Sequence, residues 1–455
     1  MKPVDSIARV FEKTLNSSCQ DVLIIVPPFA GIDRPALGVH LLQAEAKRAG
    51  FDVTILYANL LFAQYIGTSA YNVICYASAA NLIGESCFRS AAFGYLPPWD
   101  SEANGEAHFK RVNNRLALDF DALRNIQEIA PQWCDEFAKA VAKYSFRIVG
   151  CTTTFEQTCA SVAFLNRIKG RKPDIITILG GANCEGDMAQ GIMSLGADID
   201  YIFSGESEAS FVSFLQNGDS GTLPSERIVH SSPNYRLDDI AVPSFQSFYD
   251  QLQTTFPDFD SQKTWLPYEN SRGCWWGEKH HCTFCGLNGE SMPFRQKTPG
   301  TVIRELSSLT AIHASKKVLM VDNIMPHSYF SSVLPRVAAE VPGLHIFYEQ
   351  KANLTLSKIE LLKQAGVAVI QPGIEALSTP LLKLMKKGVR ASQNLALLRY
   401  ARSVELGVNW NMLFGFPDDK ADWYESALTI MPYIAHLQPP MGFYKLSIDR
   451  FSPLL

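Results

Sequence analysis

The chain has 455 residues, of which 47% are hydrophobic, so it can fold into two or three domains with sizeable cores. A formal net charge of -4 argues against a nucleic-acid partner, because phosphate binding needs an excess of cationic side chains. No apolar run reaches the roughly 18 residues needed to cross a bilayer, and residues 1–21 lack a signal-peptide core, so we expect a cytoplasmic protein without membrane contact.

Short apolar strands alternate with helical segments over the first half of the chain. Strands are expected at 21–29, 51–58, 146–155, 174–186 and 199–215. The first of them ends in two prolines, and a segment with helical spacing follows it up to Gly50. This order predicts an α/β fold in which residues 1–217 form a doubly wound, Rossmann-like domain with a parallel sheet.

A helical insertion is expected at about 60–145, between the second and third strands of this domain. The segment is rich in aromatic residues and alanine, has helical periodicity, and is too long and too apolar for a loop. We expect it to pack over the ligand edge of the sheet. Trp99 and Trp133 are expected to belong to its core instead of forming a cofactor site.

Small and hydroxyl-bearing residues follow the strands of the first domain. In open α/β sheets the ligand crevice lies at the carboxyl ends of the strands, so these residues are predicted to line one rim. The set consists of Thr152, Thr153, Thr154, Gly180, Gly181, Gly205 and Glu206. Glycine at such positions lets the backbone approach a large ligand closely.

Three marks of this domain occur in the order found in the cobalamin-binding domains of many radical enzymes: the double proline ending at Pro28, the glycine pair 180–181, and "GESE" at 205–208. Residues 20–215 therefore resemble such a domain, and a general nucleotide-binding or response-regulator-like fold is the alternative. The resemblance implies that Pro28 and the rim residues contact cobalamin. Some cobalamin domains carry a D-x-H-x-x-G motif whose histidine ligates cobalt. The frame "DRPALG" has Pro35 in that place, which implies cobalamin without that ligand.

Residues 218–262 lose the periodicity and contain turn-forming sequences such as "NGDSGTLPSE" and "SSPNY", so we expect a linker there. Alternation of strand and helix returns over 263–455. Strands are expected at 317–325, 344–354, 367–377, 408–419 and 443–451. The pattern predicts a partial (β/α)6 barrel of the TIM type, with its chemistry at the carboxyl ends of the strands.

Three cysteines in "GCWWGEKHHCTFCGLNG" have the spacing C-x7-C-x2-C: Cys274, Cys282 and Cys285. Three thiolates can hold three irons of a [4Fe–4S] cluster and leave the fourth iron open. Alternatively, His280 or His281 completes a tetrahedral zinc site. The residues alone leave both possibilities open, and the position of the motif, after the first strand of the predicted barrel, favours the cluster. The other cysteines lie in apolar or helical segments and are expected to be reduced core thiols.

Further segments of the second half resemble one family of radical enzymes. In chain order they are "DNIM", "YEQKANLT", "QPGIEALS", "LMKKGV", "WNMLFGFPDD", "HLQPP" and "DRFSP". With the cysteine motif they resemble the cobalamin-dependent radical S-adenosylmethionine (SAM) enzymes of the RiPP-maturation C-methyltransferase family. A first cysteine gap of seven residues, in place of the usual three, is a mark of that branch. Asp418 and Asp419 depart from the usual G-x-PG-E turn.

The resemblance implies roles for individual residues of the second half. Cys274, Cys282 and Cys285 would ligate the [4Fe–4S] cluster. The residues implied at SAM are Phe284 at the adenine, Asp322 and Asn323 at the amino group, Lys351 at the carboxylate, Glu349 at a ribose hydroxyl or the peptide, and Gln371, Gly373, Glu375 and Asn411 around the cofactor. A solvated ion pair is the alternative for Glu349 and Lys351. The tryptophans Trp275, Trp276 and Trp410 would shape a pocket or pack in a core.

The implied function is transfer of a methyl group from methylcobalamin to an unactivated carbon of a ribosomally synthesised precursor peptide, after hydrogen abstraction by a 5'-deoxyadenosyl radical. The implied partners are that peptide and an electron donor such as flavodoxin or ferredoxin. One alternative is a cobalamin-dependent radical SAM enzyme that catalyses a rearrangement or ring contraction. A second is a cofactor-binding protein with impaired catalysis, because the chain ends at "DRFSPLL" and the C-terminal extension usual in the family is absent.

Overall fold

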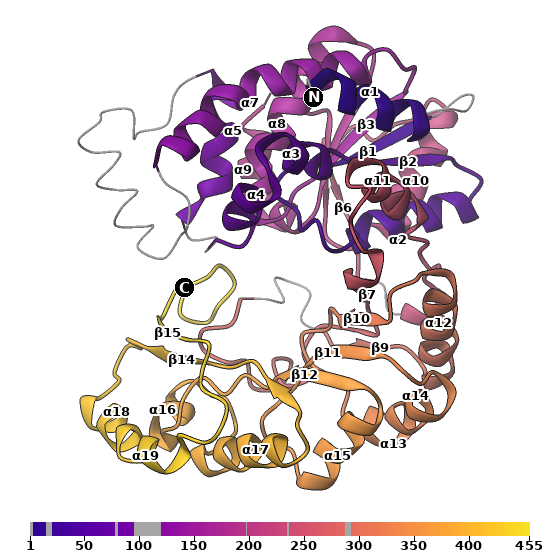
Figure 1. Ribbon diagram of the computed structural model, residues 1–455. Coiled ribbons are helices and arrows are strands. Elements are labelled where there is room, and N and C mark those ends of the chain that lie inside the picture. Colours follow the sequence, from indigo (N-terminus) through magenta and orange to yellow (C-terminus); the bar gives the residue numbers. More distant parts are fainter. Residues whose placement is uncertain are drawn as a thin grey trace. The chain divides into compact units, whose positions relative to one another are not determined.

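In the computed structural model the chain forms two compact units (Figure 1). The first comprises Met1–Pro233 and Ile240–Asp260, and the second comprises Asn234–Asp239 and Ser261–Leu455. The structure describes residues 3–14, 21–77, 81–94, 120–196, 198–233, 236–286 and 293–455. None of the helices in these ranges is both long enough and apolar enough to span a membrane.

Six parallel strands form the sheet of the first unit. Their order is β2 (Val53–Tyr57), β1 (Val22–Val26), β3 (Ile148–Thr152), β4 (Ile176–Gly180), β5 (Tyr201–Ser204) and β6 (Ile228–His230). Strand β1 consists only of β-branched residues and leucine and is buried along its whole length, as in sheets that are covered on both faces. Because β1 pairs with β2 on one side and with β3 on the other, the predicted doubly wound topology is confirmed.

Helices surround this sheet and supply most of the residues between its strands. They are α1 (Pro3–Thr14), α2 (Leu37–Arg48), α3 (Ala58–Ile66), α4 (Thr68–Cys75), α5 (Ile83–Phe93), α7 (Phe120–Val141), α8 (Thr158–Arg171), α9 (Asp187–Met193), α10 (Glu208–Asp219) and α11 (Gln246–Thr255). Helices α3, α4, α5 and α7 belong to the predicted insertion, and they account for most of its described residues. Trp99 lies outside the described residues.

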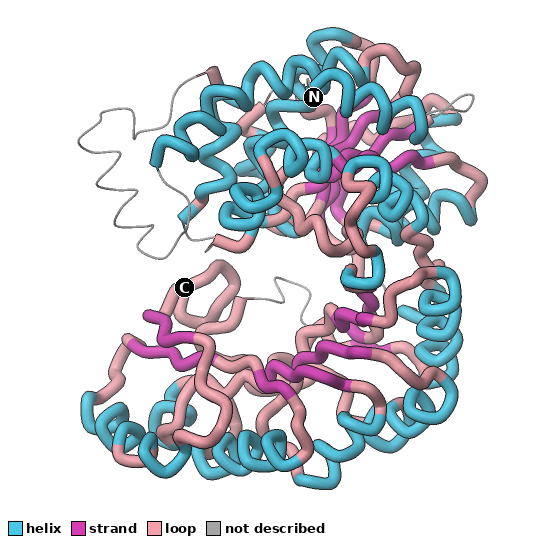
Figure 2. Tube along the Cα trace, in the orientation of Figure 1, coloured by secondary structure: helices cyan, strands magenta, loops and turns pink. Residues whose placement is uncertain are grey.

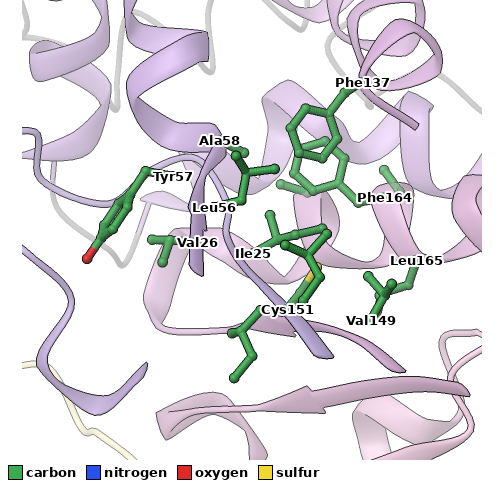
Figure 3. Close-up of a cluster of buried hydrophobic side chains, with 14 of the residues drawn as sticks. Ile25, Val26, Leu56, Tyr57, Ala58, Phe137, Val149, Cys151, Phe164 and Leu165 are labelled. Carbon is green, nitrogen blue, oxygen red and sulfur yellow. The ribbon is translucent and has the colours of Figure 1, made fainter. Parts of the chain in front are cut away.

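The insertion contributes a large aromatic cluster to the core. Trp133 of α7 is 2% exposed, and its ring lies 5.4 Å from that of Phe137 and 4.9 Å from that of Phe62. Phe137 stacks on Phe164 of α8 at 4.6 Å, and Figure 3 shows both rings in one cluster with side chains of the sheet. The expected core role of Trp133 is therefore confirmed. The insertion packs against α8 through α5 and α7, and its residues Cys75 and Tyr76 also line a cavity at the carboxyl ends of the strands, so it covers part of the ligand edge as expected.

The predicted linker over 218–262 is wrong in part, because this segment adds β6 and α11 to the first unit. Ile228 of β6 pairs with Ile202 of β5. The side chain of Gln251 in α11 accepts the backbone N–H of Tyr57 at 2.9 Å and donates to the carbonyl of Ile55 at 2.9 Å. Strand β6 has three residues, which are too few to show the alternation of polar and apolar residues that predicts a strand. The turn-forming sequences on either side therefore dominate the pattern.

The second unit is a partial barrel of parallel strands whose helices lie along one side of the strands (Figure 2). Its main sheet has the order β13 (Gly407–Val408), β12 (Val367–Gln371), β11 (His345–Glu349), β10 (Lys317–Met320) and β7 (Leu266–Tyr268). Strands β14 (Asn411–Phe414) and β15 (Gly442–Lys445) form a parallel pair, and a bridge between Glu375 and Met412 connects β14 to the segment after β12. Since β13 and β14 are two parts of one strand interrupted at Trp410, the predicted partial (β/α)6 barrel is confirmed.

Helices follow the strands of this barrel in the expected alternation. They are α12 (Pro299–Ile312), α13 (Tyr329–Ser332), α14 (Leu334–Glu340), α15 (Leu356–Gln364), α16 (Thr379–Leu384), α17 (Ala391–Ser403), α18 (Ala421–Leu428) and α19 (Met431–Ile434). A short antiparallel pair, β8 (Ser271–Arg272) and β9 (Arg295–Gln296), brackets the cysteine-containing loop. The buried Trp410 donates its indole N–H to the carbonyl of Gln438 at 3.0 Å, so it packs in the core of this unit.

The aromatic cluster predicts a large effect of Trp133→Ala. We expect the free energy of unfolding to fall by about 3–5 kcal/mol, because the substitution leaves a cavity among several rings. The control is Leu195→Ala at a residue that is 42% exposed, with an expected change within about 0.5 kcal/mol. Urea unfolding followed by circular dichroism measures both. Equal losses in the two variants would contradict the core role of Trp133.

Candidate active site

A cavity of about 620 Å³ lies in the first unit at the carboxyl ends of β1, β3, β4 and β5. Of the predicted rim residues, these line it: Thr152, Thr154, Gly180, Gly181, Gly205 and Glu206. Thr153 does not, because it is fully buried and its hydroxyl bonds to Thr158 and Asn183 at 3.0 Å each. Pro28 is buried beside the cavity and does not line it, whereas its neighbour Phe29 does.

The glycines of the rim are required by contacts within the protein. A Cβ atom on Gly181 would lie 2.4 Å from the carbonyl oxygen of Thr153, and one on Gly205 would lie 2.9 Å from that of Ser231. Both have positive φ angles, of 119° and 92°. The sequence predicts glycine here because the backbone approaches a ligand. The structure adds a second reason, because the backbone at the strand ends packs too closely to leave space for side chains.

The wall of the cavity is mostly apolar, which local pattern did not predict. Side chains from β1, β4, β5 and α2 form it, among them Ile24, Val26, Leu42, Leu179 and Phe203. A cavity with an apolar wall and a few polar groups at its rim is typical of sites for large organic ligands.

The "DRPALG" frame lies at this cavity and carries no imidazole. Pro35 lines the cavity, and no histidine does so among the residues that the structure describes. Its neighbour Arg34 is a polar lining residue, with its guanidinium 3.4 Å from the hydroxyl of Tyr76. The Tyr76 hydroxyl in turn donates to the carboxylate of Asp33 at 3.1 Å. The helical insertion therefore reaches the cavity at the C-terminal end of α4, through Tyr76.

A short turn after β3 carries an exposed ring at the rim of the cavity. Phe155 lines the cavity, is 69% exposed, and has a φ of 37°, a backbone conformation that a bulky residue rarely adopts. Asn183 donates to the Phe155 carbonyl at 3.1 Å, and Gln157 both caps Thr154 and donates to the carbonyl of Pro27 at 2.9 Å. These hydrogen bonds hold the strained turn against the end of β1.

Glu156, in the middle of this turn, points into the protein. It is 4% exposed; one carboxylate oxygen accepts the backbone N–H of Glu85 at 3.0 Å, and the other has no hydrogen-bond partner. Burial raises the pKa of Glu156 to about 7, and the carboxylate of Glu85 adds to the effect. A carboxyl group that ionises near neutral pH thus lies directly beneath the rim.

In the second unit, the cysteine-containing loop is fixed by backbone and indole contacts. The indole N–H of Trp275 donates to the carbonyl of Met325, and that of Trp276 to the carbonyl of Lys386, both at 3.1 Å. The backbone N–H of Thr283 donates to the carbonyl of Met385 at 3.1 Å. The loop is therefore held at two places, after β10 and after α16. From sequence, the two tryptophans could line a pocket or pack in a core. Their indole hydrogen bonds show that they fix the loop.

The three cysteines are half-buried and form no disulfide, and the neighbouring histidines have contacts of their own. His281 lies 2.8 Å from the carbonyl of Cys285, and the ring of His280 packs on Trp276 at 4.3 Å. Within the described ranges, no three or more histidine, cysteine or acidic side chains converge to hold a single metal ion. Three thiolates can hold three different irons of a [4Fe–4S] cluster, so this set of donors fits such a cluster.

Charged residues from β11 and from the segment after β12 gather next to the thiols. The ammonium of Lys351 lies 2.8 Å from the centroid of the Trp276 ring and donates to the carbonyl of Lys387 at 2.8 Å. The ammonium of Lys387 lies 3.5 Å from the carboxylate of Glu375. Burial lowers the pKa of Lys351 to about 7. The sequence predicts no role for Lys387. The only sign of its importance is that it lies in "LMKKGV", one of the segments that carry the family resemblance.

Glu349 and Gln371 occupy the ends of adjacent strands, as predicted. The Gln371 amide donates to the Glu349 carboxylate at 3.5 Å, at the limit of a hydrogen bond. Burial raises the pKa of Glu349 to about 7, and the carboxylate of Glu375 adds to this. Gly373, with a φ of 57°, lies so close to Lys387 that a Cβ atom would be 2.7 Å from the ammonium. The structure thus brings these predicted residues together.

The remaining predicted SAM residues have varied surroundings. Asp322 is 2% exposed, and one of its oxygens accepts the Ser271 hydroxyl at 2.7 Å, the N–H of Asn270 at 3.1 Å and the N–H of Ser271. It therefore fixes the backbone that leads into the cysteine loop, and its role at SAM stays a prediction. Asn323 follows it and is half-buried. The ring of Phe284 lies 5.9 Å from that of Phe416, and Asn411 begins β14.

Comparison with known sequences decides the class of the second unit. Residues 269–430 match the sequence model of the radical SAM superfamily. The second unit contains a radical SAM domain. A protein of Pyrococcus horikoshii, the uncharacterized methyltransferase PH0819, is 22% identical over an alignment of 319 residues that covers 64% of this chain and 65% of that protein.

Two solved structures are similar over both units. The cobalamin-dependent SAM radical enzyme OxsB, solved with aqua-cobalamin bound, has a TM-score of 0.63 and 13% identity over 96% of this chain and 54% of its own. The radical SAM methyltransferase TsrM from Kitasatospora setae, solved with cobalamin and a [4Fe–4S] cluster, has a TM-score of 0.60 and 13% identity over 96% of this chain and 74% of its own. The chain thus spans about half the length of OxsB and less than two thirds of PH0819. At these identities the likeness shows the fold.

Trp276 in the radical SAM domain predicts a strong effect of Gly388→Ala. The new Cβ atom would lie 2.1 Å from the Trp276 ring, at a backbone φ of 66°. Gly343→Ala is a matched control, because Gly343 also has a positive φ, of 82°, but has open space around it. We expect the control to lose about 1 kcal/mol of unfolding free energy from backbone strain, and Gly388→Ala to lose about 1–3 kcal/mol more from overpacking. Equal losses in urea unfolding would show that the indole does not pack there.

Glu156 predicts a pH-dependent effect of Glu156→Gln. In the folded protein the carboxyl keeps its proton up to about pH 7, whereas in the unfolded chain it loses it near 4.5. The unfolding free energy of the wild type should therefore fall, relative to Glu156→Gln, as the pH rises from about 4.5 to 7, by up to about 3 kcal/mol. Urea unfolding at pH 5 and pH 8 measures this difference. Glu226→Gln, an exposed position, controls for net charge, and a difference that does not change with pH would contradict the burial of an ionisable Glu156.

Proposed function

We propose that this protein is a cobalamin-dependent radical SAM C-methyltransferase that methylates an unactivated carbon of a ribosomally synthesised peptide. One observation carries the proposal: a single chain combines an apolar cavity at the carboxyl ends of a parallel sheet with three cysteines, none in a disulfide, in a radical SAM domain. The fold shared with OxsB and TsrM supports it, since both are radical SAM enzymes that were solved with cobalamin bound. The order of the motifs from "DNIM" to "DRFSP" supports the peptide substrate.

Cys274, Cys282 and Cys285 are the proposed cluster ligands. They form no disulfide, are half-buried, and lie in a loop that indole and backbone contacts fix. When bound, the cluster with SAM supplies a 5'-deoxyadenosyl radical, and methylcobalamin supplies the methyl group. The protein's own part is to bind and orient these groups and to keep water away from them.

The cavity of the first unit is the proposed cobalamin site. Its apolar wall suits the broad face of a corrin, and its polar lining residues Thr152, Thr154 and Glu206 suit amide groups at the edge of such a ligand. Pro35 at the cavity means that this position offers no nitrogen ligand to cobalt. We propose that the exposed ring of Phe155 packs against the ligand. Burial of the ring would offset the free-energy cost of its strained backbone.

The polar residues at the ends of β11 and β12 are the proposed SAM site. Lys351 has three N–H donors, of which one is used by the Lys387 carbonyl, so two are left for the SAM carboxylate. Glu349 and Gln371 are proposed for the ribose hydroxyls. Phe284 is proposed for the adenine, Asp322 and Asn323 for the amino group, and Gly373, Glu375 and Asn411 for the remaining surface. An electron donor of the flavodoxin or ferredoxin type is the proposed source of electrons.

Anaerobic reconstitution with iron, sulfide, hydroxocobalamin and a strong reductant tests the proposal. We expect about four irons per chain, bound cobalt, and formation of 5'-deoxyadenosine from SAM. With a random peptide library, a methyltransferase adds one methyl mass per modified residue, whereas a rearrangement leaves the mass unchanged. Bound zinc without iron, or no retained cobalamin, would overturn the proposal. Bound cofactors without SAM cleavage would instead indicate a binding protein.

The two proposed cofactor sites predict separable effects of Cys282→Ala. We expect the variant to lose its cluster iron and 5'-deoxyadenosine formation while it keeps cobalamin, since the cavity lies in the other unit. The control is Cys159→Ala, a half-buried free cysteine of the first unit, which should keep both cofactors. Iron analysis and visible absorption spectra measure the two contents. Unchanged iron in Cys282→Ala would exclude this cysteine as a ligand.

A further inference from the structure

Lys387 is a cation held inside the radical SAM domain next to the cysteine loop. Its side chain is 15% exposed, and its ammonium lies 3.5 Å from the carboxylate of Glu375, which is 16% exposed. Its ammonium is also 5.7 Å from the centroid of the Phe284 ring, the residue between Cys282 and Cys285. The missing side chain of Gly373 leaves the space that this ammonium fills, 2.7 Å from where a Cβ atom would be. Three neighbours thus define its position.

The charge of Lys387 acts on the proposed cluster ligands. Its ammonium interacts electrostatically with the thiols of Cys282 and Cys285, and that of Lys351 interacts with those of Cys274 and Cys282. The two lysines differ in their contacts, because Lys351 is covered by the Trp276 ring and hydrogen-bonded to a backbone carbonyl. The ion pair of Lys387 is with Glu375, whose carboxylate lies 3.5 Å away and partly balances the charge of the ammonium.

A cluster held by three thiolates brings negative charge next to Lys387, and one-electron reduction of the cluster adds one further negative charge. A nearby cation that is shielded from water lowers the energy of both additions, because charges interact strongly where the effective dielectric constant is low. Hydrogen bonds and charges around the sulfurs are among the means by which proteins set the potentials of iron–sulfur clusters. A carboxylate at the same place acts in the opposite direction. Lys387 and Glu375 are therefore expected to have opposite effects on the reduction potential of the cluster.

We propose that Lys387 is a positioning residue for the cluster site, whose charge, balanced by Glu375, favours the reduced state of the cluster. This inference rests on the proposed function of the three cysteines as cluster ligands. It gives Lys387 a role that is separate from contact with SAM.

Redox titration of the reconstituted full chain without SAM tests this. In Lys387→Met, the ratio of reduced to oxidised cluster at a fixed potential should fall at least about tenfold, which is about 59 mV for a one-electron couple. Lys387→Arg keeps the charge and should stay within about twofold of the wild type. Lys386→Met is the matched control, because the Lys386 side chain is exposed, and it should leave the ratio unchanged. Electron paramagnetic resonance measures the reduced fraction, and iron analysis normalises it.

Glu375→Gln provides a second, independent variant with the opposite sign. It should raise the ratio of reduced to oxidised cluster several-fold, so the inference can be tested even if Lys387→Met does not take up iron. Unchanged ratios in both variants would overturn the inference. So would an unchanged ratio combined with weaker binding of SAM to Lys387→Met, because Lys387 would then be a SAM ligand. A wild-type chain without a cluster would overturn the proposed function, and the inference with it.

Discussion

Parallel pairing of strands is the constraint on which both units depend. Parallel strands need a crossover after each strand, so all their carboxyl ends meet at one edge and the loops that leave them are neighbours. In the first unit, the ends of β1, β3, β4 and β5 enclose the cavity. In the second, residues far apart in sequence meet for the same reason: the cysteine loop, Lys351 after β11, and Glu375 after β12.

Several ionisable side chains are buried or half-buried at these edges. Burial raises the pKa values of Glu156, Glu349 and Asp322 to about 7 and lowers that of Lys351 to about 7. A stable core alone has no need of such groups, because apolar residues of similar volume would pack there without loss of hydration. Groups with perturbed pKa values gather at functional sites, and their places in both units agree with that tendency.

The long gap between the first two cysteines has a structural explanation. It holds two tryptophans, whose indole N–H groups donate to the carbonyls of Met325 and Lys386, on two different loops. It also holds His280, which packs on Trp276. The rest of the gap forms turns, in which the N–H of His280 donates to the carbonyl of Trp276 at 2.9 Å and that of His281 to the carbonyl of Gly277 at 3.1 Å. His280 and His281, which made zinc a plausible alternative from sequence, make contacts within the loop, with the Trp276 ring and the carbonyl of Cys285.

The sequence by itself determined the architecture and the set of chemical groups. Strand runs such as that of β1 and the cysteine spacing are local patterns, and they predicted the doubly wound domain, the partial barrel and most of the rim residues. The tertiary structure decided which side chains of a set point toward the site. Thr152 and Thr154 line the cavity while Thr153 is buried, because side chains alternate along an extended backbone. It also decided the place of β6 in the sheet and the position of Lys387 beside Glu375, since both depend on partners distant in sequence, which no local pattern records.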